Sequence, residues 1–486
     1  MAGATIHKPE AASGMRRTLV LAALLSGTFM LLLDTTIVNL ALPPITEDLH
    51  AGESALQWIV SGYALAFGLF LLPSGWLGDR IGHKSVLILG LAVFTVASLM
   101  CGLSGGAAEL IVWRVVQGAA AGAVNPSIMA FIRLLYHNNE RGRAFAAYGT
   151  VAGAATSLGP VLGGLLIEWD LAGLMWRPIF LVNLPIGVAA VTAVALLAPR
   201  TATTVRRLDV VGLILVTAAM FALTFPLTQG HEIGWPLWTF VMLAAAPVLM
   251  AAFTRWQLHL LRNGRDPLVD VRLFARRSFA AGVGLILAFF AGFVGLMFAV
   301  SLYLQIGLGH STLVAGLILM PFAIGTGAGS IIGNTVVAPR LGRAVLHIGT
   351  VTVCLGLGGL MLVLGLVATP PSLGWFVAPF LIAGFGCGMI IGPNANIVLS
   401  DVPSDIAGVA SGTLSTSQRL GTALGVAAIG VVLFSSLAGA DSGSLAVDYT
   451  HATMLALACS MAAMILTGLL AFLLPRRSAG KTPGEG

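Results

Sequence analysis

The stretch LLLDTTIVNLALP, from Leu31 to Pro43, places a single carboxylate, Asp34, in the middle of an apolar run that covers residues 17–44. About 20 apolar residues suffice for a helix to cross a bilayer. A charge near the membrane centre costs roughly 2.5–3.5 kcal/mol on insertion scales, and such residues usually face a cavity and serve function. The stretch therefore predicts a membrane-spanning helix that carries a functional acid.

The composition of the whole chain agrees with a membrane protein. Of its 486 residues 57% are hydrophobic and 9% are charged, whereas soluble domains carry about 25% charged residues. The four cysteines are isolated, without a CxxC spacing, and the nine histidines form no HExxH pattern. We therefore expect no metal, no cofactor and no enzymatic site.

Fourteen apolar segments of spanning length recur along the chain. They cover residues 17–44, 55–78, 85–104, 107–134, 143–167, 177–198, 208–228, 236–258, 278–305, 311–338, 345–367, 374–400, 405–436 and 452–474. The sequence thus predicts an all-α integral membrane protein. Glycines recur every fourth residue in two segments, at Gly325, Gly329 and Gly333 and at Gly384, Gly388 and Gly392, which predicts close helix packing.

The basic residues predict the orientation of these spans. Of the 25 lysines and arginines, 22 fall on the side of the amino terminus, Arg177 falls on the other side, and Arg114 and Arg419 lie within spans. Positively charged loops stay in the cytoplasm, so we expect both termini there and the chain in the cell membrane. This distribution argues against a nucleic-acid partner despite the net charge of +6.

Two groups near the amino terminus are candidates for proton chemistry. Asp34, shielded from water, can take up and release a proton as its surroundings change; alternatively it is structural and satisfied by Thr35 or Arg114. In RVVQGAAAGAVNP, residues 114–126, Arg114 shares one helical face with Gln117 and Asn125. Arginine stays protonated, so Arg114 either biases a nearby acid or anchors backbone carbonyls.

Two further motifs are candidates for gating. The loop GWLGDRIGHKS, residues 75–85, contains Asp79 and Arg80, and Asp79 can pair with Arg141 or Arg143 as a conformational latch or belong to a solvated turn. The loop is similar in spacing to TVVAPRLGRAV, residues 335–345, which indicates duplicated halves. In LGPVLGG, Gly159 and Pro160 predict a bent, closely packed helix. No nucleotide-binding motif occurs, which argues against transport driven by ATP.

Polar and aromatic side chains within the spans are candidates for substrate binding. They are Asn39, Trp58, Tyr63, Gln117, Asn125, Phe293, Tyr303, Asn394 and Arg419. Arg419 belongs to a polar stripe with Ser411, Ser415, Gln418 and Thr422, and it is either a substrate ligand or a structural residue. For each aromatic residue the alternative is ordinary packing in lipid.

Together, LDTTIVNLALP, GWLGDRIGHKS, RVVQGAAAG and LGPVLGG resemble motifs of the major facilitator superfamily, specifically its fourteen-span drug–proton antiporters. The resemblance implies two six-helix bundles around a central cavity. We expect the first bundle in residues 1–200, two additional spans (208–228 and 236–258) in residues 201–277, and the second bundle in residues 278–486. It also implies alternating access, with proton entry coupled to drug exit.

The same resemblance assigns roles to residues. Asp34 would be the protonation or substrate site, Arg114 would assist proton coupling, and Asp79 would gate with Arg80 and the helix-five arginines. We expect a monomer in lipid that exchanges protons for small amphipathic drugs or antibiotics; a proton-linked uptake symporter and a lipid flippase are the alternatives. Because the second half offers Arg419 and no acid in the middle of a span, we expect dications to be disfavoured as substrates.

Overall fold

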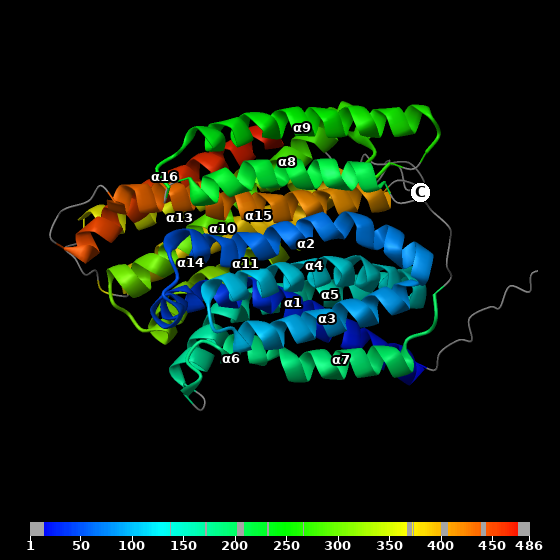
Figure 1. The fold of residues 1–486 in the computed structure, drawn as a ribbon, viewed down its shortest axis with the longest axis horizontal. Helices are drawn as coiled ribbons and strands as arrows, with labels where there is room; N and C mark the ends of the chain where they lie inside the picture. Colours follow the sequence, from blue (N-terminus) through cyan, green and yellow to red (C-terminus); the bar gives the residue numbers. More distant parts are fainter. Residues whose placement is uncertain are drawn as a thin grey trace, which may run out of the picture.

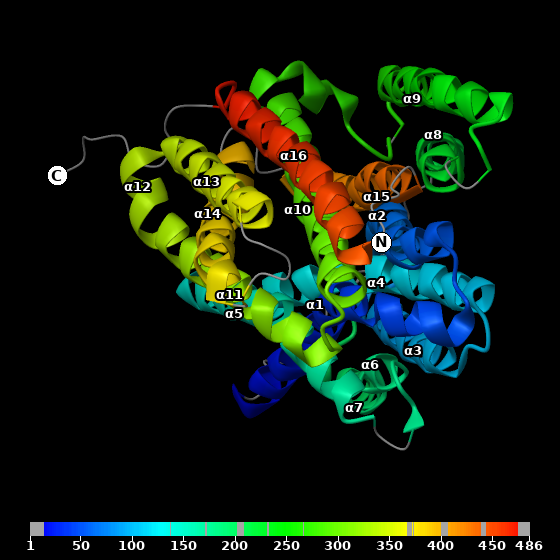
Figure 2. The same ribbon diagram turned by 90° about the vertical axis from the view of Figure 1, so that its left-hand side faces the viewer.

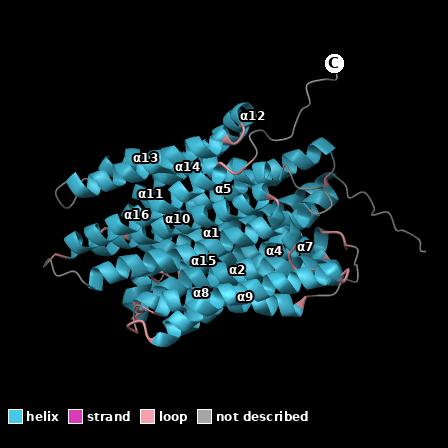
Figure 3. Cartoon of the chain, turned by 90° about the horizontal axis from the view of Figure 1, so that it is seen from above, coloured by secondary structure: helices cyan, strands magenta, loops and turns pink. Residues whose placement is uncertain are grey.

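The computed structural model describes residues 14–136, 138–170, 173–201, 209–230, 233–265, 267–366, 372, 374–399, 407–438 and 444–474. In these residues every regular element is a helix, as Figure 3 shows. The elements are α1 (Gly14–Leu49), α2 (Glu53–Ile81), α3 (His83–Leu103), α4 (Ala107–Leu135), α5 (Asn138–Glu168), α6 (Pro178–Leu181), α7 (Asn183–Leu197), α8 (Val210–Gln229), α9 (Leu237–Arg262), η2 (Val271–Ala275), α10 (Arg277–Leu302), η3 (Tyr303–Gly307), α11 (Thr312–Ile332), η4 (Gly333–Val337), α12 (Ala338–Leu341), α13 (Ala344–Leu366), α14 (Gly374–Leu399), α15 (Ala407–Ala438) and α16 (Leu445–Ala471).

The helices match the expected membrane passes. Among the described residues, 13 helical stretches are long and apolar enough to cross a membrane. The remaining expected pass, residues 143–167, lies within α5, a helix of 31 residues. Two details differ from expectation: the sixth pass is divided into α6 and α7, and the last begins at Leu445 instead of residue 452. The all-α membrane fold is thereby confirmed.

The two halves of the chain use the same packing scheme. In the first half α4 packs against α2 and α3, and α1 packs against α5 and α7. In the second half α14 packs against α11 and α13, and α10 packs against α15 and α16. Figure 2 shows the resulting two groups of helices end-on. The domain boundaries at residues 200 and 277 stay a prediction.

The two similar loops occupy equivalent places in this scheme. Gly82 (φ 89°) separates α2 from α3, and Gly342 (φ 54°) precedes α13, so both loops turn at a residue with positive φ. Lys84 donates through Nζ to two carbonyls at the end of α7, at 2.7 and 2.8 Å. Arg343 likewise donates to two carbonyls just beyond α16, at 2.6 and 2.7 Å. The corresponding contacts support an internal duplication of the chain.

Glycines allow the helices of the second half to touch through their backbones. A Cβ atom on Gly325 or Gly329 would overlap a carbonyl oxygen of α14, and one on Gly384 or Gly388 would overlap a carbonyl oxygen of α11. Small residues at four-residue spacing permit this approach. The close packing expected from the two glycine repeats is therefore present between α11 and α14.

The two additional helices lie at the side of the molecule. Helix α8 packs against α2 and α15, and α9 packs mainly against α8, at the top of Figure 1. Asp209 holds the pair together: its carboxylate accepts from the Gly212 amide at 2.8 Å and from the Gln257 side chain at 2.6 Å. In the segment between α9 and α10, hydrogen bonds from Arg272 lower the pKa of Asp270.

Candidate functional site

Asp34 lies in a closed polar cluster inside the first half of the chain. Its side chain is fully buried. One carboxylate oxygen accepts from Arg114 at 2.5 Å, and the other accepts from Gln117 at 2.9 Å and from Asn183 at 3.3 Å. Ser98 accepts from the same two amide groups, at 3.1 and 2.9 Å. Four helices, α1, α3, α4 and α7, thus contribute to the surroundings of one acid.

Arg114 is held as tightly as the acid it pairs with. Its side chain is 1% exposed, and its Nε donates to the Ile59 carbonyl at 3.1 Å. Its guanidinium also donates to Gln117 at 2.7 Å and lies 4.1 Å from the centre of the Tyr63 ring. Buried charges are stable only when paired and hydrogen-bonded, and both conditions are met here. The two alternatives for Arg114, pairing with an acid and anchoring a carbonyl, are both realised.

A separate cavity lies between the two halves of the molecule. It comprises about 930 Å³ of space, part of which is open to solvent, and is lined by α1, α5, α10, α11 and α15. Its lining residues are Leu32, Thr35, Thr36, Asn39, Leu40, Pro160, Phe290, Phe293, Val294, Met297, Leu319, Phe322, Ala323, Thr326, Gln418, Arg419 and Thr422. The α1 members recur at intervals of three and four residues, which defines one helical face. Asp34 does not belong to that face, so the acid and the cavity lie on different sides of α1.

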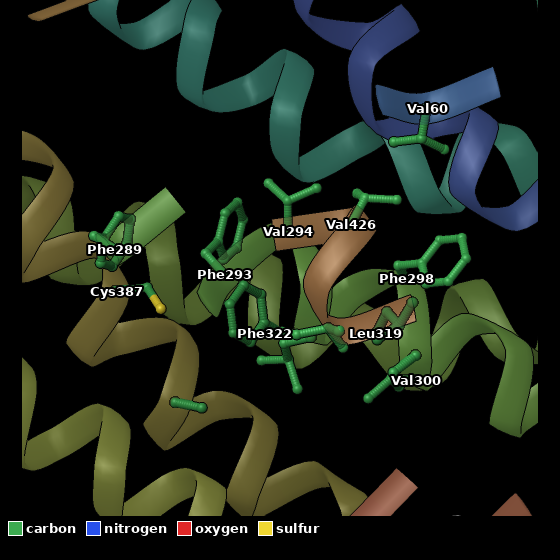
Figure 4. Close-up of a cluster of buried hydrophobic side chains, with 14 of the residues drawn as sticks. Val60, Phe289, Phe293, Val294, Phe298, Val300, Leu319, Phe322, Cys387 and Val426 are labelled. Carbon is green, nitrogen blue, oxygen red and sulfur yellow. The ribbon is translucent and has the colours of Figure 1, made fainter. Parts of the chain in front are cut away.

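Aromatic rings form one wall of the cavity. Phe293 stacks on Phe322 with ring centres 5.7 Å apart and an interplanar angle of 20°. Behind it, Phe289 stacks on Phe293 at 5.9 Å and 9°, and Phe290 meets Phe293 edge to face. Figure 4 shows Phe289, Phe293 and Phe322 side by side. Ring faces at these distances provide a flat apolar surface suited to other aromatic groups.

Arg419 brings a positive charge to the same cavity. It is 7% exposed, and its guanidinium lies 3.9 Å from the centre of the Phe67 ring on α2. In the part of the chain that the structure describes, Arg419 forms no ion pair. The aliphatic part of its side chain lies against α2: a Cβ atom on Gly68 would lie 2.9 Å from the Arg419 Cβ. Gln418 and Thr422, from the same polar stripe, also line the cavity.

The cavity is closed at the end of the molecule where α1 ends and α2 begins, called here the α1–α2 end. There α5 packs against α11: a Cβ atom on Gly164 would lie 2.8 Å from the Leu313 Cα. Ser301 of α10 donates to the Asn39 carbonyl of α1 at 2.6 Å. Near the same end, Gly430 of α15 lies against the Gln57 side chain of α2. These contacts join the two halves of the chain.

The structure divides the nine candidate substrate residues among several places. Asn39, Phe293 and Arg419 line the cavity, whereas Tyr63 and Gln117 belong to the Asp34 cluster. The sequence could not separate these two groups, because both lie on apolar helices and only the tertiary packing decides which face meets the cavity.

The remaining four candidates contact other elements. Trp58 faces α8, with two phenylalanine rings 6.0 and 6.2 Å away. Asn125 accepts from the hydroxyl of Tyr148 at 3.0 Å and so joins α4 to α5. Tyr303 is buried in η3, which packs against α16, and Asn394 is buried on α14. In this conformation none of the four is among the described residues that line the cavity.

Of the gating candidates, three are placed by their contacts. A Cβ atom on Gly159 would overlap the Thr36 hydroxyl of α1, and the carbonyl of Pro160 lies against Gly316 of α11. The Arg80 side chain is exposed, and its guanidinium lies 5.2 Å from the centre of the Trp76 ring. The side chains of Asp79, Arg141 and Arg143 lie outside the described part of the chain.

Sequence reasoning missed two members of the Asp34 cluster, Ser98 and Asn183. Both are fully buried, and Ser98 also donates to the Phe180 carbonyl at 2.9 Å. A signal for Asn183 was present, since it is a lone amide within the apolar pass 177–198. Polar residues in lipid-embedded helices usually face the interior of the bundle.

This arrangement of two packed halves around a cavity can be compared with known proteins. The sequence profile of the Major Facilitator Superfamily matches residues 24–426. The chain belongs to the major facilitator superfamily. It is accordingly a multi-pass membrane transporter and not an enzyme.

Relatives of this transporter carry names that refer to antibiotics. A probable actinorhodin transporter of Streptomyces coelicolor is 37% identical over 431 residues, which cover 88% of this chain and 75% of the relative. The tetracenomycin C resistance and export protein of Streptomyces glaucescens is 33% identical over 447 residues, which cover 88% and 78%. An auto-inhibited peptide transporter of the POT family aligns with a TM-score of 0.69 at 17% identity over 96% of this chain and 99% of its own, a likeness of fold.

Proposed function

We propose that this transporter exports small amphipathic molecules, such as antibiotics, across the cell membrane in exchange for protons. The observation that carries the proposal is the position of Asp34 and its partner Arg114 behind the cavity, on the opposite side of α1. A proton site and a substrate site then share one helix. The names of the relatives, which refer to transport, resistance and export, support the outward direction.

The closed end of the cavity is assigned to the outside of the cell. Of the 25 basic residues, 22 fall on the opposite side by the expected topology, and positive loops stay in the cytoplasm. The structure then corresponds to the state that takes up substrate from the cytoplasm. Both termini are cytoplasmic in this assignment, and the transporter works as a monomer in lipid.

The proton acts on the balance between two conformations. In the present conformation Asp34 is paired with Arg114 and buried away from the surface. When the molecule opens to the outside, water reaches the carboxylate, and protonation removes the charge that holds Arg114. Removing one partner of a buried pair costs about 3–5 kcal/mol, so the cluster rearranges and α1 moves with it. A proton shifts the equilibrium only by its different affinity for the two conformations.

An aromatic link connects the proton cluster with the cavity. Tyr63 lies under the Arg114 guanidinium and donates to the Leu31 carbonyl of α1 at 3.2 Å. Phe67, one turn further along α2, meets Tyr63 edge to face at 5.9 Å and lies under Arg419. Three successive contacts, Arg114–Tyr63, Tyr63–Phe67 and Phe67–Arg419, therefore connect the proton cluster with a residue that lines the cavity.

Gating is assigned to both ends of the molecule. We infer that Asp79 and Arg80 form a latch with Arg141 and Arg143 at the cytoplasmic end when the molecule opens outward. Gly159 and Pro160 close the outer end in the present conformation through their contacts with α1 and α11.

Flux in everted vesicles tests the proposal. Vesicles from a pump-deficient host that expresses the transporter are given an acidic interior and a panel of fluorescent dyes and aromatic antibiotics. Antiport predicts that at least one compound accumulates inside as protons leave, and that collapsing the pH gradient abolishes the accumulation. A proton-linked symporter predicts movement in the direction of the protons. Accumulation of every compound independent of the gradient contradicts proton coupling.

A further inference from the structure

Among the described residues that line the cavity, Arg419 is the single charged one. Of the 17 residues that line it, the other 16 are uncharged and none is a carboxylate. Asp34, an acid on α1, projects from another face of that helix and is paired with Arg114. The cavity therefore presents a positive charge to whatever it binds.

The protein provides only part of the contacts that the Arg419 guanidinium can make. Phe67 offers the face of its ring at 3.9 Å, and such cation–π contacts contribute about 0.5–2 kcal/mol. A ring face offers no oxygen to the five N–H groups of a guanidinium, which remains protonated in proteins. In the described residues neither a carboxylate nor a carbonyl accepts a hydrogen bond from Arg419. A ligand with an anionic oxygen would supply the missing acceptors, and guanidinium–carboxylate bonds are among the stronger hydrogen bonds.

The remaining lining fixes the shape of such a ligand. The stacked rings of Phe293 and Phe322 give a flat apolar wall. Within the described part of the chain, the side-chain oxygen of Asn39 is buried without a hydrogen-bond partner, although Asn39 lines the cavity. That oxygen would accept from a hydroxyl or amide of the ligand. A buried polar atom without a partner costs about 1–3 kcal/mol, so it favours a ligand that provides a donor.

We propose that the cavity selects planar aromatic molecules that carry one ionised acid group, a carboxylate or a phenolate. The acid group bonds to Arg419, and the ring system lies along Phe293 and Phe322. This inference rests on the proposed function and narrows its substrates from amphipathic molecules in general to aromatic monoanions. A structural role for Arg419 predicts no such preference.

A matched pair of probes tests the preference in the intact transporter. Anthraquinone-2-carboxylate and anthraquinone-2-carboxamide have the same ring system and differ in charge. Binding to the purified protein in detergent is measured by calorimetry. We expect the carboxylate to bind at least about tenfold more tightly, equivalent to about 1.4 kcal/mol. Equal binding of the two probes, or tighter binding of the carboxamide, overturns the proposal without the need for a variant.

Variants then locate the source of the preference. Arg419→Gln is expected to bind both probes equally, whereas Arg419→Lys keeps part of the preference because it keeps the charge. Arg340→Gln, which removes an exposed arginine outside the cavity, is the matched control and should retain the full preference. An unchanged preference in a monodisperse Arg419→Gln sample contradicts the role of Arg419.

Flux measurements separate this inference from the proposed function. If wild-type vesicles accumulate the carboxamide as well as the carboxylate under a pH gradient, export stands and the charge preference fails. If the purified protein prefers the carboxylate but vesicles move neither probe under the gradient, the cavity chemistry stands and proton-driven export fails.

Discussion

At the scale of single residues, the separation of Asp34 from the cavity changes how coupling is explained. A proton and a substrate that compete for one carboxylate exclude each other by direct contact. Here the carboxylate is enclosed by Arg114, Gln117 and Asn183, and the cavity lies on the other side of α1. Exchange therefore has to act through the position of α1 and its neighbours.

Replacing Asn183 tests how much the hydrogen bonds of the Asp34 cluster contribute to the stability of the fold. Asn183→Leu removes one of two amide donors to an Asp34 oxygen and to Ser98, while Gln117 still donates to both, and each lost hydrogen bond contributes about 0.5–1.5 kcal/mol. We expect a lower melting temperature in detergent, followed by circular dichroism. Thr192→Val on the same helix is the control, because Thr192 is exposed and bonds only to the Val188 carbonyl. A variant as stable as this control would show that the Asn183 contacts contribute nothing.

The sequence indicated the importance of Asp34 and Arg114 because charges are rare in apolar spans. It also offered their pairing as one alternative. The sequence did not determine which uncharged polar residues join the pair. Asn183 reaches Asp34 because α7 packs beside α1, and Ser98 joins the cluster through Gln117 and Asn183 because α3 packs against α4 and α7. Those contacts between distant segments are absent from any local pattern.

At the scale of helices, the length of the apolar runs predicted nearly every element. Exceptions arose where polar residues occur inside a helix. Helix α16 begins before Asp448 and His451, which interrupt the apolar pattern and so delayed its predicted start. The π-helical turns η3 and η4 were also unforeseen, because such turns depend on local packing and leave no periodic signal.

The backbone contact between α11 and α14 gives a prediction at this scale. In Gly329→Val the new side chain would overlap the Phe385 carbonyl of α14, so the helices have to separate. We expect a strong loss of folded protein, measured as the monodisperse fraction after solubilisation. Gly327→Val, two residues away on the same helix, is the control, because no neighbouring atom lies within 4 Å of a Cβ at that position. Comparable losses in both variants would refute a specific role for the α11–α14 contact.

At the scale of the whole molecule, two duplicated halves meet along α5–α11 and α2–α15. The resemblance of short motifs foresaw this architecture, and the profile match over residues 24–426 shows the family. The conformation could not be predicted, because one sequence encodes every conformation that the protein adopts. The contact of Gly164 with Leu313 identifies which end is closed here.

A cross-link tests whether that closed end opens during transport. In a background without the four native cysteines, Gln57→Cys with Gly430→Cys should form a disulfide under oxidation and stop gradient-driven flux. The Gln57 side chain that a Cβ atom on Gly430 would meet is itself replaced in this pair. A reductant should restore the flux, and each single cysteine variant should be unaffected by the oxidant. Undiminished flux through a fully cross-linked sample would show that the α2–α15 contact does not separate.

The central claim is that Asp34 is required for proton coupling and not for substrate binding, and one variant tests both parts of it. Because Asp34→Asn leaves Arg114 unpaired, the double variant Asp34→Asn with Arg114→Gln accompanies it; replacing both partners of a buried pair is often tolerated. Ligand affinity is measured in detergent, and accumulation driven by a pH gradient is measured in everted vesicles. We predict a Kd within about threefold of wild type, since no ligand contact is lost, and no gradient-driven accumulation. Retained gradient-driven accumulation, or loss of binding in a folded variant, would contradict the account.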